Sequence, residues 1–305
     1  MSGNMLGVKK SNPQKKVFAQ FHPLVIFSYY VGALALLMLL FHPTFLVGAL
    51  VCIIMIHFVQ DRCRNLQRWF FFLLISSLFI ALLNPIFNHR GRTVLFEVFQ
   101  QRITLEATMF GVTTALTLMG VMALFVSYNE MMTPNKIFYL FSKFLPQFAV
   151  LLMLTLRFIP LMRRRLEEIA AVQISKGIAV AQGAWKNRAK SGLLYVQVLL
   201  TYSLEEAIQT ADSMKARGYG KGQRSAYDYF HVKKSDVVAL LFFVIVFLFT
   251  AVERYFGHGL LTIYPMMESL ELSKMDITTM VGFFVFLGFP IYVELGGIHR
   301  WRRFN

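Results

Sequence analysis

The sequence is poor in charged residues and in cysteine. Only 15% of its 305 residues are charged, whereas soluble globular proteins carry about 25%. Its two cysteines, Cys52 and Cys63, form neither a spaced metal motif nor a disulfide framework. The chain is instead 56% hydrophobic and contains 31 Phe. This composition excludes an ordinary cytosolic enzyme and indicates a protein that crosses a membrane several times.

The short motifs of common enzyme classes are also missing. The chain contains no G-x-x-x-x-G-K-[ST], no H-E-x-x-H and no G-x-S-x-G. The glycine-rich run 218–222 follows an expected helix and not a strand, which favours a helix-ending turn over a nucleotide site. A metal site formed by His42 and His89 is conceivable, but a structural role explains both residues better. We therefore expect no catalytic, cofactor-binding or metal-binding residues.

Long apolar runs are what the sequence does contain. A membrane-spanning helix needs about 20 largely apolar residues, and no alternating strand pattern stands out. The sequence therefore predicts an all-α, polytopic membrane protein with about six transmembrane helices and long cytoplasmic helices between them. The six runs lie at 24–41, 43–60, 69–87, 104–127, 237–255 and 279–298. We expect three regions: transmembrane helices in 1–127, a cytoplasmic or interfacial region in 128–236, and transmembrane helices in 237–305.

The basic residues predict the orientation of these helices. With the N-terminus inside, 26 of the 31 Lys and Arg fall in inner segments, at 1–23, 61–68, 128–236 and 299–305. Cytoplasmic loops carry such an excess of Lys and Arg. The net charge of +15 thus reports membrane orientation and not nucleic-acid binding. We expect a multi-pass protein of the cell membrane with both termini in the cytoplasm, and a first span that is retained and not cleaved.

The region 128–236 is too long for a linker. Its apolar stretch 135–162 is interrupted by Pro134, Pro146 and Pro160, so we expect helices at the inner membrane surface and leave their number open. An amphipathic segment then ends at Gly177, and a second runs from 191 to 217. The apolar face of this second segment, within 193–214, either packs on the chain's own helices or receives a partner.

Four ionisable residues interrupt apolar runs. His57, Glu106 and Glu294 lie near the ends of spans, where we expect their side chains to reach the membrane interface. Arg157 lies in Leu156-Arg157-Phe158-Ile159-Pro160-Leu161, and either an interfacial position or a carboxylate partner would satisfy it.

Two helix ends in 128–236 share a pattern. Ser175-Lys176-Gly177 and Ala216-Arg217-Gly218 both place a cation directly before a glycine that ends the helix. The simple interpretation is that the cation complements the helix dipole. The functional interpretation is that two long helices present cationic tips to a soluble partner, for which the planar guanidinium of Arg is well suited.

With these motifs the sequence resembles the T component of energy-coupling factor (ECF) transporters, the CbiQ-like family. The resemblance rests on Ala216-Arg217-Gly218 within Ser-Met-Lys-Ala-Arg-Gly-Tyr-Gly, and on the segment Leu156–Leu161. Ser175-Lys176-Gly177 stands where the family usually has its first Ala-Arg-Gly, so lysine replaces arginine there. The resemblance covers most of the chain, from the first span through the second motif.

The resemblance implies a function in transport without catalysis by this chain. T components couple two ABC-type ATPase subunits to a membrane-embedded, substrate-binding S component that takes up a vitamin, a vitamin precursor or a transition-metal ion. Arg217 and Lys176 would then be the tip cations, while Ala216, Gly218 and Gly177 would allow close approach. A self-sufficient secondary transporter or channel is the alternative, followed by an intramembrane enzyme. Both leave the region 128–236 without a role.

Overall fold

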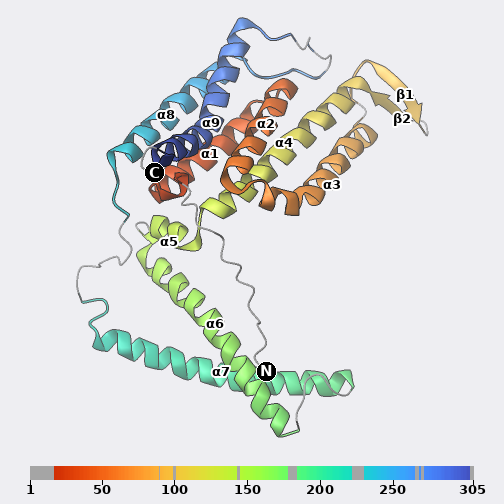
Figure 1. The fold of residues 1–305 in the computed structure, drawn as a ribbon. Coiled ribbons are helices and arrows are strands. Elements are labelled where there is room, and N and C mark those ends of the chain that lie inside the picture. Colours follow the sequence, from red (N-terminus) through yellow and green to blue (C-terminus); the bar gives the residue numbers. More distant parts are fainter. Residues whose placement is uncertain are drawn as a thin grey trace. The chain divides into compact units, whose positions relative to one another are not determined.

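A computed structural model describes residues 17–88, 90–98, 101–142, 145–177, 184–221, 230–264, 268 and 271–302. The chain divides into two compact units (Figure 1). Unit 1 combines Met1–Pro134 with Phe230–Asn305, and unit 2 is Asn135–Tyr229.

Unit 1 contains the predicted membrane helices. Within the described residues, five helices are long and apolar enough to cross a membrane, and α1 is a shorter apolar helix. All six predicted apolar runs fall on these helices, which confirms the all-α, polytopic class. Their bounds are α1 Pro23–Leu39, α2 Pro43–Asp61, α3 Arg64–Phe87, α4 Leu105–Met131, α8 Lys234–Tyr255 and α9 Lys274–Arg302, and a short 3₁₀ helix, Phe18–Gln20, precedes α1.

The core of unit 1 is aromatic. Tyr29 of α1 is fully buried, stacks on Phe286 of α9 at a centroid distance of 5.7 Å, and meets the edge of Phe18 at 5.5 Å. Phe243 of α8 adds a further ring 5.3 Å from that of Phe286. In contrast, α3 packs mainly on α4 and exposes most of its apolar side chains. A helix that is apolar on all sides and covered on one side only is typical of a membrane span.

Two helices begin directly after a histidine, at His-Pro pairs. Pro23 opens α1 and Pro43 opens α2, because the missing N–H of proline costs nothing in the first turn of a helix. The Nδ1 atom of His22 accepts a hydrogen bond from the backbone N–H of Leu24 at 3.2 Å. Burial lowers the pKa of His22 below its usual value, which favours the neutral ring that this cap requires.

The structure corrects the expectation that three ionisable residues reach the membrane interface. Glu294 is buried and accepts two backbone N–H groups of the segment before α1, including that of Phe18 at 3.1 Å. Glu106 is buried and accepts the N–H of Thr93 at 3.2 Å. His57 is fully buried, with Nε2 2.9 Å from a backbone carbonyl of α4. Hydrogen bonds within the protein therefore satisfy the two carboxylates and hold one ring nitrogen of His57.

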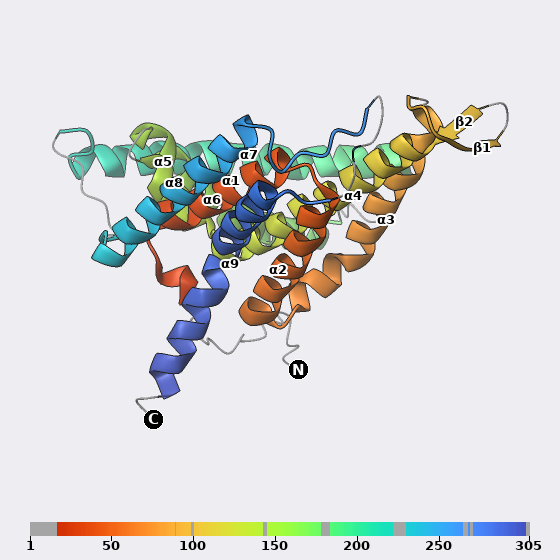
Figure 2. The ribbon, with the colours of Figure 1, turned by 90° about the horizontal axis from the view of Figure 1, so that it is seen from above.

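One feature that the sequence does not predict is a short β-hairpin between α3 and α4. Its strands, β1 Val94–Val98 and β2 Gln101–Thr104, pair antiparallel, with Val98 opposite Gln101. Both views place the hairpin beside the neighbouring ends of α3 and α4 (Figures 1 and 2). The hairpin is too small to change the all-α class.

The described residues of unit 2 form three helices, and the first of them starts at Pro134, the last residue of this part of unit 1. They are α5, Pro134–Ser142, α6, Pro146–Ser175, and α7, Trp185–Ala216. Pro134 and Pro146 open helices, but Pro160 lies inside α6, so the expected interruption at Pro160 is wrong. The second amphipathic helix begins at Trp185, six residues before the predicted start. At about 1.5 Å per residue, α6 and α7 are rods about 45–48 Å long.

Candidate functional site

The tip of α7 is a glycine-capped helix end. The helix ends at Ala216, and Arg217 follows with φ −79° and ψ 3°. Gly218 has φ +80°, and the N–H of Tyr219 donates to the carbonyl oxygen of Met214 at 3.0 Å. This is the hydrogen bond of a Schellman motif, which needs a left-handed residue after the cap. Arg217 thus occupies the cap position of a well-defined turn.

The tip of α6 has the same backbone conformation. Its last helical residue is Ser175, Lys176 has φ −86° and ψ 7°, and Gly177 has φ +81°. The N–H of Gly177 donates to the carbonyl oxygen of Ile174 at 2.9 Å, which matches the bond from Gly218 to Lys215 at the other tip. Both predicted motifs therefore present a cation from the same turn.

These tips are open on their outer side. Ser175, Lys176, Ala216 and Arg217 are exposed. Nothing lies within 4 Å of the position that a Cβ would take on either capping glycine. Within the described part of the chain, neither tip cation forms an ion pair. Each tip thus exposes a positive charge that forms no ion pair with the described residues of its own unit.

The two rods cross at their middles, as Figure 1 shows. The Ser203 hydroxyl of α7 lies 2.9 Å from the sulfur of Met162 of α6. The Arg165 guanidinium lies over the ring of Tyr202, 4.6 Å from its centroid. Arg165 also pairs with Glu168 at 2.7 Å, and this hydrogen bond raises the pKa of the guanidinium. The two rods are therefore in direct side-chain contact at this crossing.

The predicted apolar face of α7 lies away from this crossing. Leu193, Leu200 and Leu204 are 70%, 64% and 66% exposed. The contacts with α6 include those of Tyr202 and Ser203. Within unit 2 the face is thus not the packing surface between the two rods.

Arg157, the remaining predicted residue, is exposed on α6. It forms no ion pair with a described residue, so the expected carboxylate partner is not found in that part of the chain. An interfacial position is the alternative that remains.

A metal site receives no support from the geometry. Among the residues that the structure describes, no three His, Cys, Asp or Glu side chains come together. Nδ1 of His42 lies 2.6 Å from the hydroxyl of Thr44, and His89 lies outside the described residues.

Comparison with known proteins gives matches to one family. The family model described as CbiQ, cobalt transport protein, matches residues 8–227, more than two thirds of the chain, including both tips. Similar proteins include the energy-coupling factor transporter transmembrane proteins EcfT of Bacillus selenitireducens, Staphylococcus aureus and Listeria innocua. Their identities to this chain are 30%, 23% and 29%, over 36%, 64% and 52% of its length. The matches span 42%, 79% and 63% of those relatives.

Proposed function

Because the chain belongs to the CbiQ family, we propose that it is the coupling subunit of an ECF-type importer for a micronutrient. Its partners are two ABC-type ATPase subunits and a membrane-embedded S component. The S component recognises a vitamin, a vitamin precursor or a transition-metal ion. ATP hydrolysis takes place on the ATPase subunits.

The main support for this proposal is that the two helix tips have the same backbone conformation. Lys176 and Arg217 follow two long helices, each before a glycine with φ near +80°. Two equivalent cationic turns suit two equivalent subunits, one tip for each ATPase. An acidic groove on each ATPase would pair with the tip cation, and Arg217 would do so through two parallel hydrogen bonds.

The crossing of α6 and α7 supplies the mechanical step. When nucleotide binding closes the ATPase pair, the two tips are displaced together. The contacts of Arg165 with Tyr202 and of Met162 with Ser203 hold the rods at their middles, so a displacement at the tips changes the angle between them. That change moves any protein that is bound to α6 or α7.

We assign the S component to the apolar face of α7. Leu193, Leu200 and Leu204 are about two-thirds exposed and follow one another at intervals of seven and four residues along one helix. An exposed apolar stripe of this kind is typical of a protein or membrane interaction site. Binding there would place the S component directly on a rod that the ATPases move.

The experiment is a charge reversal at one tip. The chain is co-expressed with the ATPase pair and S component of its organism, and Arg217→Glu is compared with Lys190→Glu. Lys190 is an exposed cation near the other end of α7. Removing one partner of a desolvated charge pair costs about 2–5 kcal/mol. We therefore expect Arg217→Glu to lower ATPase capture at least thirtyfold and to abolish uptake, whereas Lys190→Glu preserves both.

A second pair of variants tests the first tip. Lys176→Glu should weaken capture, and Lys176→Arg should preserve or strengthen it because guanidinium pairs bidentately with carboxylate. Equal capture by wild type, Arg217→Glu and Lys176→Glu would contradict the proposal.

A further inference from the structure

One face of α3 carries two arginines followed by large apolar side chains. Arg64 and Arg68 lie one turn apart at the start of the helix, and both are exposed. Phe71, Ile75 and Phe79 continue the same line at intervals of three or four residues, and they are 72%, 49% and 62% exposed. Residues at such intervals share one side of a helix. This side, here called the Arg64 face, thus begins with two positive charges and continues as an apolar surface.

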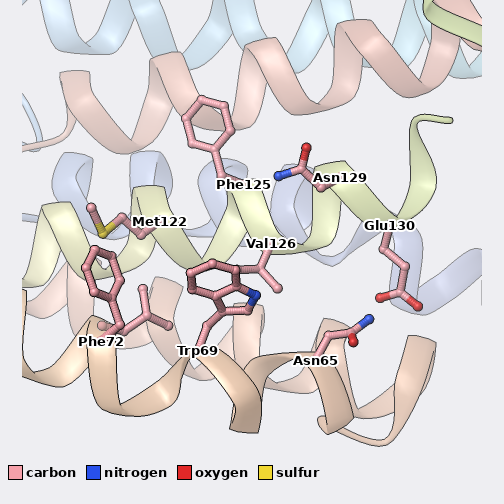
Figure 3. A pocket seen from close by; sticks show the side chains of 9 residues that line it. Asn65, Trp69, Phe72, Met122, Phe125, Val126, Asn129 and Glu130 are labelled. Carbon is pink, nitrogen blue, oxygen red and sulfur yellow. The ribbon is translucent and has the colours of Figure 1, made fainter. Parts of the chain in front are cut away.

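The Arg64 face is separate from the side of α3 that meets α4. A groove lies between these two helices, and Figure 3 shows Asn65, Trp69 and Phe72 on the side of α3 that lines it. Each of the three directly follows a residue of the Arg64 face, and successive residues of a helix are about 100° apart. The Arg64 face therefore points away from the groove, and unit 1 leaves its side chains exposed.

A third arginine lies at the same end of the helix. Only Arg62 and Cys63 separate α2 from α3, and they have positive φ values of 48° and 60°. This conformation is uncommon outside glycine, and it makes the connection a tight turn, so Arg62 stays close to the first turn of α3. The segment 61–68 thus contains three arginines and one carboxylate, that of Asp61.

These three arginines lack an ionic partner among the described residues. None of them forms an ion pair there, and the first turn of α3 contains no acidic side chain. The helix dipole does not explain them, because the positive end of a helix disfavours cations. An orientation signal requires basic residues on the cytoplasmic side, but it does not require them in line with an exposed apolar stripe.

The Arg64 face crosses the boundary between the cytoplasm and the membrane. α3 is a candidate membrane span, and the distribution of Lys and Arg assigns its first turn to the cytoplasmic side. Lipid phosphates of the inner leaflet meet the helix at that depth, and acyl chains meet it further along. Anionic lipids attract basic segments that lie directly beside a span.

We propose that the Arg64 face binds an anionic glycerophospholipid of the cytoplasmic leaflet, of the phosphatidylglycerol type. Arg64 and Arg68 hold the lipid phosphate, Arg62 lies at the edge of the same site, and an acyl chain lies along Phe71 and Ile75. A guanidinium can donate two parallel hydrogen bonds to phosphate oxygens. A zwitterionic lipid fits less well, because its own ammonium group would lie among three cations. The inference rests on the membrane position of α3 and is independent of the coupling function.

An indole placed on the Arg64 face reports the lipid that contacts it. The three Trp of the chain are changed to Phe, and Phe71→Trp then supplies the sole indole, three residues after Arg68. The full-length variant is reconstituted into phosphatidylcholine vesicles with a small fixed fraction of acyl-brominated lipid, either phosphatidylglycerol or phosphatidylcholine. Bromine quenches only indoles that it contacts. One cation near the membrane surface strengthens the binding of anionic lipid about fivefold, so we expect at least a fivefold preference for phosphatidylglycerol.

Arg68→Gln tests the headgroup contact, and Lys234→Gln is the matched control. Lys234 is an exposed cation at the start of another candidate span, α8. Arg68→Gln should lower the preference for phosphatidylglycerol about fivefold, whereas Lys234→Gln should leave it unchanged. A second indole position is supplied by Val238→Trp in the same background without other Trp. Val238 lies one turn after Lys234 and is 66% exposed, and the preference there should be several times weaker.

Equal quenching by the two brominated lipids with all three arginines in place would overturn the proposal, whether or not the Gln variant folds. An equal preference at positions 71 and 238 would also overturn it, because it indicates a diffuse attraction to the whole basic side. Displacement of the brominated lipid by inorganic phosphate, with ionic strength matched by chloride, would contradict it by identifying the ligand as a soluble anion. Absence of quenching by either lipid would contradict it as well and would indicate that a protein partner covers the Arg64 face.

Discussion

The two tips differ in one functional group although their backbones match. Lys176 and Arg217 have nearly the same φ and ψ, and each precedes a left-handed glycine. An ammonium is a compact point charge, whereas a guanidinium presents a rigid fork of N–H donors. Since the backbone does not compensate for this difference, we expect the two proposed ATPase contacts to be unequal, with the contact of Arg217 the stronger.

Alanine substitutions at Gly218, just after the end of α7, and at Gly192, inside α7, should change the stability of the helix in opposite directions. Gly218 has φ +80°, where a Cβ costs about 1–2 kcal/mol. Gly192 lies inside α7 with nothing within 4 Å of its Cβ position, so alanine there should stabilise the helix by about 0.5–1 kcal/mol. By amide hydrogen exchange, Gly218→Ala should speed exchange in the last turn of α7 about five- to thirtyfold, and Gly192→Ala should slow it near residue 192.

If both alanine variants changed the exchange rate in the same direction, the result would contradict the Schellman cap assigned to Gly218. Gly218→Asn serves as a further control, because asparagine tolerates the left-handed conformation better than alanine. Its exchange should lie between that of the wild type and that of Gly218→Ala.

At the scale of helices, proline shows where local sequence is sufficient and where it is not. Pro23, Pro43 and Pro146 each open a helix, but Pro160 lies inside α6. Proline in the first turn loses no hydrogen bond, whereas inside a helix it removes one and crowds the carbonyl four residues earlier. The sequence around Pro160 does not distinguish these cases, because both flanks are helical in pattern. Only the structure therefore shows that α6 continues through Pro160.

The contact between α3 and α4 depends on a glycine. A Cβ on Gly111 would lie 3.0 Å from both the carbonyl oxygen of Ala81 and the Cβ of Asn84. Small residues allow membrane helices to approach this closely. We expect Gly111→Ala to destabilise unit 1 by about 1–3 kcal/mol and to lower the thermal midpoint measured in a single detergent. Gly288→Ala, on α9 with open space around it, should leave the midpoint unchanged or slightly higher, and an equal loss in both variants would exclude a packing origin.

At the scale of the whole molecule, the distribution of Lys and Arg predicts which side of the membrane each segment faces. In a chain without Cys52 and Cys63, Lys221→Cys should react with an impermeant maleimide only after the cells are opened. Glu271→Cys, in the exposed segment before α9, should react in intact cells. This outcome follows because basic segments remain in the cytoplasm. Labelling of position 221 in intact cells would reverse the topology and remove the tips from any cytoplasmic ATPase.

The family assignment made from short motifs is confirmed at this scale. The family model covers residues 8–227, and the similar proteins are EcfT transmembrane proteins. The prediction of a transmembrane component that is not itself the catalytic ATPase is thus confirmed. The roles of Lys176, Arg217 and the apolar face of α7 stay predictions.

Features with local causes were determined by the sequence alone. Within the described residues, the five candidate membrane spans and the shorter apolar helix α1 follow from runs of apolar residues, because a bilayer requires about 20 largely apolar residues for a span. The turns at Gly177 and Gly218 follow from the one residue that adopts positive φ without strain.

Features that join distant parts of the chain were decided only by the tertiary structure. The carboxylate of Glu294 accepts a hydrogen bond from the backbone N–H of Phe18, 276 residues away. No local sequence pattern predicts such a partner. The crossing of α6 and α7 and the groove between α3 and α4 arise in the same way. Each depends on which side chains meet after the helices pack, and a membrane helix that is apolar all round does not encode that choice in its own hydrophobic pattern.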